Sequence, residues 1–316
     1  MGFVNQKFHF VSLQLFQPML SCLAKIHGNG STWLGGLLVG AAMLIQPPIL
    51  AAPGHPATLL PEAVHRVVFL GDSITYSGQY VDDIAAYFAL RFPSRRVEFL
   101  NLGLPSETVS GLSEEGHADG KFPRPDLRER LGRVLKKTKP DLVFACYGMN
   151  DGIYLPFSEE RFQKFKDGIL SMRAQVVASG ARIILVTPPT FDEVKGGHAG
   201  YSYTLDRYAN WLLDQRAAGW DVVDIHGPMN RYLAEQRRRD PDFFLAGDGV
   251  HCDDTGHWIM AKQILLHLGS KDVANAAEVE AFLATYPHGN EVFALVQQQQ
   301  RLLKDAWLTD TGHKRP

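Results

Sequence analysis

The chain has 316 residues, of which 45% are hydrophobic and 21% are charged, so it can bury a large core and is not intrinsically disordered. Its 32 Lys and Arg residues nearly balance its 34 Asp and Glu residues. The resulting net charge of −2 argues against nucleic acid or an acidic membrane surface as a partner. Three cysteines are too few for a disulfide framework. The length predicts one large domain or two small ones.

The N-terminal segment is typical of a secretory leader. An apolar, glycine-rich stretch at residues 33–45 (WLGGLLVGAAMLI) is followed by Pro47, Pro48 and the small residues Ala51 and Ala52. This order predicts a signal peptide over residues 1–52 and an exported protein, with a linker at 53–64. The stretch is shorter than the roughly 20 apolar residues that a spanning helix needs, so we expect no stable membrane span after cleavage.

Three other interpretations of this leader remain open. The first thirty residues are long for the polar start of a signal peptide, so translation could begin at Met19. Residues 8–20 could instead be the apolar region of a lipoprotein signal that ends at Cys22, although the residues before Cys22 fit such a cleavage site poorly. An uncleaved leader would serve as a membrane anchor.

Short apolar runs alternate with helical patterns from residue 65 to residue 270. The apolar runs predict buried strands at 66–70, 97–101, 141–147, 182–187 and 220–224. The helical patterns lie at 79–91, 126–137, 158–178, 205–218 and 255–268. Buried strands separated by helices predict a doubly wound, flavodoxin-like α/β/α domain with a five-stranded parallel sheet. Ligands of such folds bind at the carboxyl ends of the strands.

The last segment, residues 271–316, falls outside this alternation. It contains two helical patterns, at 274–284 and 291–307, and a polar run at 297–300. We expect a helical C-terminal extension there.

A candidate nucleophile follows the first predicted strand. Ser73 comes directly after Gly71 and Asp72, at the edge of the sheet where a reactive hydroxyl can be exposed. The second and third strands are followed by Gly103 and Asn150. A backbone N–H and a side-chain amide are suitable donors to a developing oxyanion. Taken one at a time, these short pieces are more typical of turns and helix caps.

A candidate base lies before the last helix of the repeat. A serine hydroxyl needs a base, and histidine is the usual one. His251 stands three residues after Asp248, which can reach its Nδ1 atom and hold one tautomer. Alone, this spacing is as typical of a surface turn as of a catalytic dyad.

In combination these motifs resemble the SGNH (GDSL) hydrolase superfamily, in the same order along the chain, from Val67 to about Leu268. The matching blocks are Phe69-Leu70-Gly71-Asp72-Ser73-Ile74-Thr75, then Gly103, Gly148-Met149-Asn150-Asp151 and Asp248-Gly249-Val250-His251. The fold expected from this resemblance is the one that the strand pattern predicts.

The resemblance implies an esterase or acylhydrolase that works through an acyl-enzyme, with no metal or other cofactor. Ser73 would be the nucleophile, His251 the general base and Asp248 the residue that orients it. The oxyanion hole would consist of the N–H of Ser73, the N–H of Gly103 and the amide of Asn150. One position departs from the family, because Cys252 stands where a proline usually follows the histidine. Without that proline the loop could be looser.

Several further residues are candidates for substrate contacts. Asp72 and Asp151 lie within the motifs and Tyr154 shortly after one of them, and His117 lies in a long inserted loop at 112–125. A solvated loop without substrate contacts is the interpretation of the His117 segment that we favour. We weighed a metal cluster of Asp221, Asp224 and His226, whose spacing matches no dedicated site.

The two cysteines beyond the leader lie near the same edge. A bridge between Cys146 and Cys252 is conceivable in an exported protein, and two separate thiols are the interpretation that we favour.

We therefore expect an exported carboxylic ester hydrolase that acts on a small-molecule or carbohydrate ester. A polar chain and a charged loop favour removal of short acyl groups such as acetyl from carbohydrate. A lysophospholipase or thioesterase is the alternative within the same chemistry. A non-catalytic carbohydrate-binding protein on the same fold is the alternative outside it.

Overall fold

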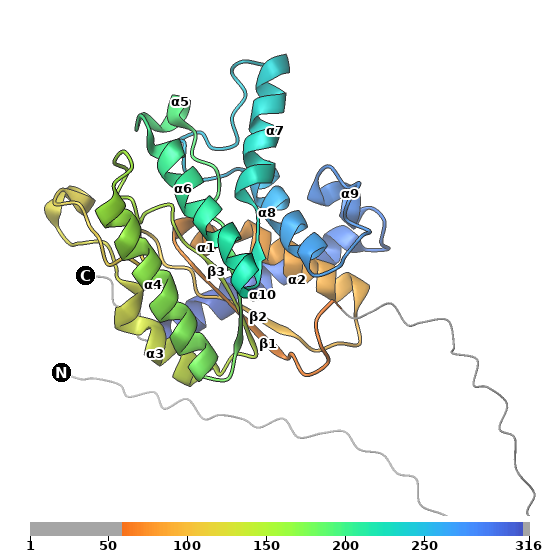
Figure 1. Cartoon of the computed structure of the whole chain (residues 1–316). Helices are drawn as coiled ribbons and strands as arrows, with labels where there is room; N and C mark the ends of the chain where they lie inside the picture. Colours follow the sequence, from red (N-terminus) through yellow and green to blue (C-terminus); the bar gives the residue numbers. More distant parts are fainter. Residues whose placement is uncertain (1–58, 312–316) are drawn as a thin grey trace, which may run out of the picture. The chain divides into compact units, whose positions relative to one another are not determined.

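The computed structural model describes residues 59–311, so the predicted leader lies outside the described residues. Five strands form one parallel sheet in the order β2-β1-β3-β4-β5 (Figure 1). The strands are β1 (Arg66–Gly71), β2 (Glu98–Asn101), β3 (Leu142–Cys146), β4 (Arg182–Val186) and β5 (Val222–Val223). The predicted fold class is confirmed, and β5 is shorter than the pattern at 220–224 indicated.

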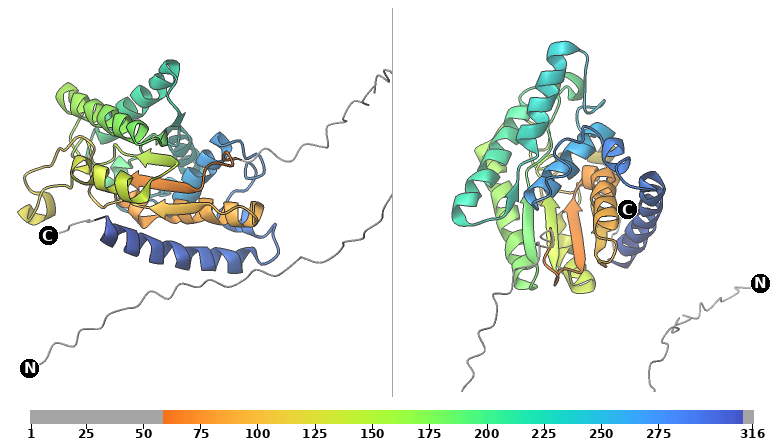
Figure 2. Two further views of the ribbon diagram at one scale, coloured as in Figure 1. Left: turned by 90° about the horizontal axis from the view of Figure 1, so that it is seen from below. Right: turned by 90° about the vertical axis from the view of Figure 1, so that its right-hand side faces the viewer.

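Helices connect the strands and cover both faces of the sheet (Figure 2). They are α1 (Ser73–Ser77), α2 (Gln79–Arg91), α3 (Leu127–Thr138), α4 (Glu159–Ala178), α5 (Glu193–Gly196), α6 (Tyr201–Asp214), α7 (His226–Arg239), α8 (Asp254–His267), α9 (Val279–Leu283) and α10 (Gly289–Asp310), with 3₁₀ turns at η1 (His117–Gly120) and η2 (Gln215–Ala218). The sequence pattern missed α7. No helix within residues 59–311 is long and apolar enough to cross a membrane.

Alternate residues of each strand enter different halves of the core. In β1, Val67 and Phe69 pack on the side of α2 and α8, whereas Val68 and Leu70 pack on the side of α3 and α4. All four side chains are completely buried. Burial of one such side chain contributes about 1.5–3 kcal/mol to stability, so this alternation fixes the position of β1 between the two helical layers.

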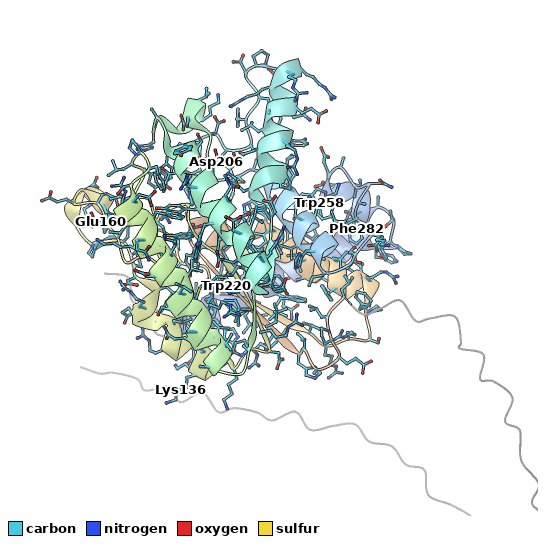
Figure 3. All side chains as sticks on the ribbon, in the orientation of Figure 1. Lys136, Glu160, Asp206, Trp220, Trp258 and Phe282 are labelled. Carbon is cyan, nitrogen blue, oxygen red and sulfur yellow. The ribbon has the colours of Figure 1, made fainter. Side chains whose placement is uncertain are left out.

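The C-terminal helices pack on the sheet domain. Helix α10 runs alongside α2, as both views of Figure 2 show, and it also contacts the edge strand β2. Its Trp307 lies 5.5 Å from the guanidinium of Arg66, at the start of β1. In the other half of the core, Trp258 of α8 stacks on Phe282 of α9 with ring centroids 6.3 Å apart, and Figure 3 labels both residues. The expected helical extension is therefore present.

The strand register brings three loops to one edge of the sheet. Phe69 pairs with Asn101 and Gly71 with Cys146, so β1, β2 and β3 end close together. The N–H of Leu104, beyond β2, donates a hydrogen bond to the carbonyl of Gly71 at 2.8 Å. The segments that follow these strands consequently share the rim where the sequence predicts the site.

Candidate active site

Three side chains from two distant parts of the chain meet at this rim. Ser73 begins α1 directly beyond β1, and Asp248 and His251 lie in the loop before α8. The Oγ atom of Ser73 is 2.8 Å from Nε2 of His251. The Nδ1 atom of His251 is 2.6 Å from Oδ2 of Asp248. Hydroxyl, imidazole and carboxylate thus form one hydrogen-bonded line, an arrangement typical of serine hydrolases.

A tight strand-to-helix turn presents Ser73. The carboxylate of Asp72 accepts a hydrogen bond from the N–H of Ile74 at 3.0 Å and caps α1. A Cβ atom at Gly71 would lie 2.1 Å from Oγ1 of Thr75, so only glycine lets the chain turn this closely. Ser73 is left partly exposed between buried neighbours.

The carboxylate of Asp248 is shared between the loop backbone and the imidazole. Its Oδ1 atom accepts hydrogen bonds from the N–H groups of Val250 and His251, at 2.9 and 2.8 Å. Partial burial acts to raise the pKa of Asp248, but these hydrogen bonds and the one from the His251 ring outweigh it and hold the pKa below its usual value. An ionised Asp248 favours the tautomer with the proton on Nδ1, which leaves Nε2 free to accept from Ser73.

The loop that carries the pair is fixed against α5. Gly249 has a φ of 82°, and a Cβ atom there would lie 2.4 Å from the N atom of Gly196 in α5. The N–H of Asp192 donates to the carbonyl of Gly249 at 2.9 Å. On the other side, Cys252 forms an antiparallel bridge with Ala246. Backbone contacts thus hold the loop where the family usually has proline.

Asn150 follows β3 at the same rim, and one of its amide N–H groups has no partner within residues 59–311. The residue is buried, and its Nδ2 atom donates to the carbonyl of Glu107 at 3.3 Å. Its Oδ1 atom accepts from the hydroxyl of Tyr154 at 3.1 Å. These contacts fix the amide plane and use only one of its two N–H groups, so the other can meet an acyl oxygen.

The geometry at Gly103 does not fit the expected role. Its N–H donates to Oδ1 of Asn101 at 3.0 Å, and the amide of Asn101 in turn donates to the carbonyl of Thr75 at 2.6 Å. A Cβ atom at Gly103 would lie 2.3 Å from the N atom of Tyr76. Glycine is needed here for the close approach of the loop to α1, and its N–H already has an acceptor.

Ser106, three residues further on, has the free donor that the sequence reasoning assigned to Gly103. Its backbone N–H has no hydrogen-bond partner within residues 59–311, and its φ is 67°. A serine in this left-handed conformation is uncommon and costs about 1–2 kcal/mol relative to ordinary backbone. The sequence contains no signal for this donor, because a serine, unlike a glycine, does not indicate a positive φ.

The two acidic substrate-contact candidates are both buried. Asp151 has no exposed surface, and its Oδ1 atom accepts hydrogen bonds from the N–H groups of Val109 and Ser110 at 2.9 and 2.8 Å. Burial raises the pKa of Asp151 to about 6 and that of Asp72 to about 7. Asp151 therefore anchors the loop beyond β2 instead of meeting a substrate, and Asp72 serves as the cap of α1.

Tyr154 contacts the candidate site through Asn150, whereas His117 contacts the Glu114–Arg124 ion pair of the inserted loop. The guanidinium of Arg124 stacks on the Tyr154 ring at 5.4 Å and forms two hydrogen bonds of 2.7 Å with Glu114. The Nδ1 atom of His117 is 3.5 Å from Glu114, and its ring packs against Phe122. Arg124 thereby links the inserted loop to Tyr154. His117 contacts the Glu114 carboxylate of this ion pair.

The two cysteines are both free and buried. The Sγ atom of Cys146 is 3.6 Å from the carbonyl oxygen of Thr187. Burial raises the pKa of the Cys252 thiol to about 12, so it stays protonated at neutral pH and is a poor nucleophile.

The residues weighed as a metal cluster have other partners. His226 Nε2 is 2.8 Å from Oδ1 of Asp206, and Asp221 Oδ1 is 2.6 Å from Nε2 of His267. The carboxylate of Asp224 accepts from the N–H of Gly227 at 3.0 Å. Within residues 59–311, no group of three or more His, Cys, Asp or Glu residues could hold a metal ion.

A parallel α/β/α sheet with a Ser-His-Asp line at its carboxyl edge is typical of one class of protein, the serine-dependent hydrolases. The GDSL-like lipase/acylhydrolase family matches residues 69–259, and the chain therefore belongs to that family. Its members are carboxylic ester hydrolases. A search of curated proteins found no match.

Solved structures share the fold. BT4096, a gut microbial diltiazem-metabolizing enzyme, is 24% identical with a TM-score of 0.53 over 65% of this chain, which spans only 47% of that longer protein. A catalytic mutant of Axe2, an acetylxylan esterase from Geobacillus stearothermophilus, is 22% identical with a TM-score of 0.52 over 66% of this chain and 95% of its own. LAE5, an alpha/beta hydrolase from the metagenome of Lake Arreo, Spain, is 24% identical with a TM-score of 0.51, over 67% and 97% of the two chains.

Proposed function

We propose that this protein is an exported serine esterase that removes short acyl groups, acetyl above all, from carbohydrate. The observation that carries the proposal is the continuous line from Ser73 through His251 to Asp248, with spacings of 2.8 and 2.6 Å. Membership of the GDSL-like family gives the reaction class. Export rests on the leader pattern at residues 33–52 alone.

Acylation follows from the proton positions in this line. His251 Nε2 takes the proton of the Ser73 hydroxyl while Oγ attacks the ester carbonyl, and the carbonyl electron pair moves to the oxygen. The N–H groups of Ser73 and Ser106 and the free N–H of Asn150 are the donors to that oxyanion. When the tetrahedral adduct collapses, His251 returns the proton to the leaving alcohol.

Deacylation uses the same groups in reverse roles. His251, again neutral, takes a proton from water, and the resulting hydroxide attacks the acyl carbon on Ser73. Collapse of the second adduct gives the carboxylic acid and restores the hydroxyl. Asp248 stays ionised throughout and stabilises the imidazolium that forms in each half.

The choice of a short acyl group on a sugar rests on the rim and on the structural neighbours. The rim carries the Tyr154 ring with the Arg124 guanidinium stacked on it, and a sugar can bind to such an aromatic and polar surface. Axe2, which shares the fold, is named as an acetylxylan esterase.

Ester hydrolysis by matched serine variants tests the proposal. The chain without its predicted leader, residues 53–316, should hydrolyse p-nitrophenyl acetate, and Ser73→Ala should abolish nearly all of this activity. Ser77→Ala, which changes an exposed serine at the other end of α1, is the control and should act like wild type. Equal rates for the two variants would exclude Ser73 as the nucleophile.

A substrate panel separates the proposal from its alternatives. Acetyl through octanoyl p-nitrophenyl esters, lysophospholipid and acetylated xylan should give the highest kcat/KM on acetyl substrates. A preference for octanoyl or lysophospholipid would favour the acylhydrolase alternative, and inactivity on the whole panel would favour a carbohydrate-binding protein. Export predicts that the protein recovered outside the cytoplasm of an expressing bacterium begins near residue 53.

A further inference from the structure

A buried ion pair lies directly behind the proposed oxyanion donors. The guanidinium of Arg130, in α3, meets the carboxylate of Glu107 through two contacts, Nε to Oε1 at 2.5 Å and Nη2 to Oε2 at 2.7 Å. The hydroxyl of Tyr147, just beyond β3, donates to Oε2 of the same carboxylate at 2.6 Å. The side chains of Arg130 and Glu107 are 2% and 0% exposed, and Tyr147 is buried as well.

The backbone of Glu107 joins this cluster to both donors. Its carbonyl accepts the hydrogen bond from the Asn150 amide, and its N–H donates to the carbonyl of Leu104 at 3.1 Å. Ser106, with its positive φ and free N–H, is the residue immediately before it. Leu104 is itself tied to Gly71, two residues before Ser73. A shift of Glu107 would therefore move two donors relative to the nucleophile.

Stability alone does not explain a charge pair in this position. A buried ion pair loses so much hydration that apolar residues of similar size often stabilise a core as well or better. Here the cost is higher, because Arg130 Nη1 is buried and has no hydrogen-bond partner within residues 59–311. The pair fixes the orientation of the Glu107 side chain, because two parallel hydrogen bonds hold its carboxylate in one plane, which apolar contacts would not do.

The same cluster can hold the strained turn at Ser106. Arg130 Nη2 also donates to the carbonyl of Leu102 at 2.7 Å. One guanidinium therefore binds Leu102 before Ser106 and Glu107 after it. A residue in an unfavourable conformation persists only where its surroundings fix it. The hydrogen bonds from Arg130 to Leu102 and Glu107 provide that constraint.

We propose that Arg130 and Tyr147 are positioning residues, which hold Glu107 so that the Ser106 N–H and the Asn150 amide face the oxyanion of the Ser73 adduct. This inference rests on the proposed esterase function. It assigns to α3 and to the end of β3 a role in turnover although neither residue touches the substrate. Loss of either contact should weaken stabilisation of the transition state more than binding of the ester.

The test compares two buried tyrosines in full-length protein. Tyr147→Phe removes the hydroxyl that holds Glu107, and Tyr208→Phe removes a buried hydroxyl that has no partner within residues 59–311, in the same half of the core. Steady-state kinetics on p-nitrophenyl acetate, thermal unfolding, and calorimetric binding of a small alkylboronic acid are measured for both. The boronic acid forms a tetrahedral adduct with a serine hydroxyl, so its affinity reports the oxyanion donors without turnover.

We expect Tyr147→Phe to lower kcat by about tenfold with KM changed less than twofold, and to weaken boronate binding by a similar factor. Tyr208→Phe should leave both values unchanged. Arg130→Lys, which keeps the charge but loses the fork, should show the same split with a larger fall in kcat. Tyr147→Phe with the kinetics and boronate affinity of Tyr208→Phe would overturn the inference while leaving the esterase function intact. A wild-type protein that neither hydrolyses esters nor binds boronate would overturn both.

Discussion

Replacement of Asp248 by asparagine should damage the site through the tautomer of His251. Asp248 gives one oxygen to two backbone N–H groups, those of Val250 and His251, and the other oxygen to the imidazole. An asparagine has a single acceptor oxygen. Two backbone donors against one ring donor favour that oxygen facing the backbone, by about one hydrogen bond or roughly 1 kcal/mol.

In that orientation the amide N–H₂ group points at Nδ1 of His251. The ring then accepts at Nδ1 and carries its proton on Nε2, so it cannot take the proton of Ser73. A fixed wrong tautomer of this kind costs about 10⁴-fold in kcat in a buried triad. Here the side chains of His251 and Asp248 are 51% and 56% exposed, and water can compete for the ring. We therefore expect a loss of about 10²- to 10⁴-fold.

Asp248→Ala is the matched comparison, because water can then accept the Nδ1 proton and the correct tautomer stays accessible. Initial rates on p-nitrophenyl acetate should rank wild type above Asp248→Ala and Asp248→Asn lowest, with equal circular dichroism for all three. An asparagine variant as active as wild type, or more active than the alanine variant, would refute the tautomer argument.

Three further changes probe the donors and the buried acids. Asn150→Ala should lower kcat about 100-fold or more in the same assay, and an unchanged rate would remove Asn150 from the oxyanion hole. Ser106→Gly keeps the backbone N–H and relieves the positive φ, so urea unfolding should show a gain of about 1 kcal/mol with activity retained; a loss of stability would contradict the strain. The pKa of Asp72 lies near 7 when folded and 3.8 when unfolded, so the folded state binds more protons between these values. Its contribution to stability is therefore complete below about pH 4 and falls as pH rises to about 7, by about 4 kcal/mol. Asp72→Asn, which can still cap α1, should reduce the decrease of the unfolding free energy between about pH 4 and pH 7. The same decrease in wild type and in Asp72→Asn would refute the raised pKa of Asp72.

The sheet was predictable because its strands are buried on both faces and read as continuous apolar runs. Residues 182–186, for example, are bounded by a Gly180 turn and by Pro188, and both limits are visible in the sequence. Helix α7 was missed because it is rich in polar residues and buries only His226, Met229 and Leu233, which leaves little helical periodicity to detect. Strand β5 has two paired residues, too few for a pattern to delimit.

Within the site, the contacts that follow from a motif or from the order of the sheet strands could be predicted, whereas those that depend on the backbone conformation of the loop beyond β2 could not. Asp248 and His251 lie in one turn, so their spacing already allowed the contact that the structure shows. The line to Ser73 spans most of the chain and needed the parallel sheet to be inferred first. Gly103 attracted the oxyanion role because glycine tolerates a close approach, but the structure uses that freedom to pack the loop on α1. The donor at Ser106 depends on backbone conformation, which composition does not reveal.

The central claim is that Ser73 forms an acyl-enzyme, and trapping that intermediate tests it most directly. Protein mixed with p-nitrophenyl acetate and quenched in acid within the first turnovers is digested and mapped by mass spectrometry. The account predicts one acetyl group on the peptide that contains Ser73, absent from Ser73→Ala and present in Ser77→Ala. Turnover of the ester with no acetyl group on that peptide, or with acetyl on another residue, would contradict it.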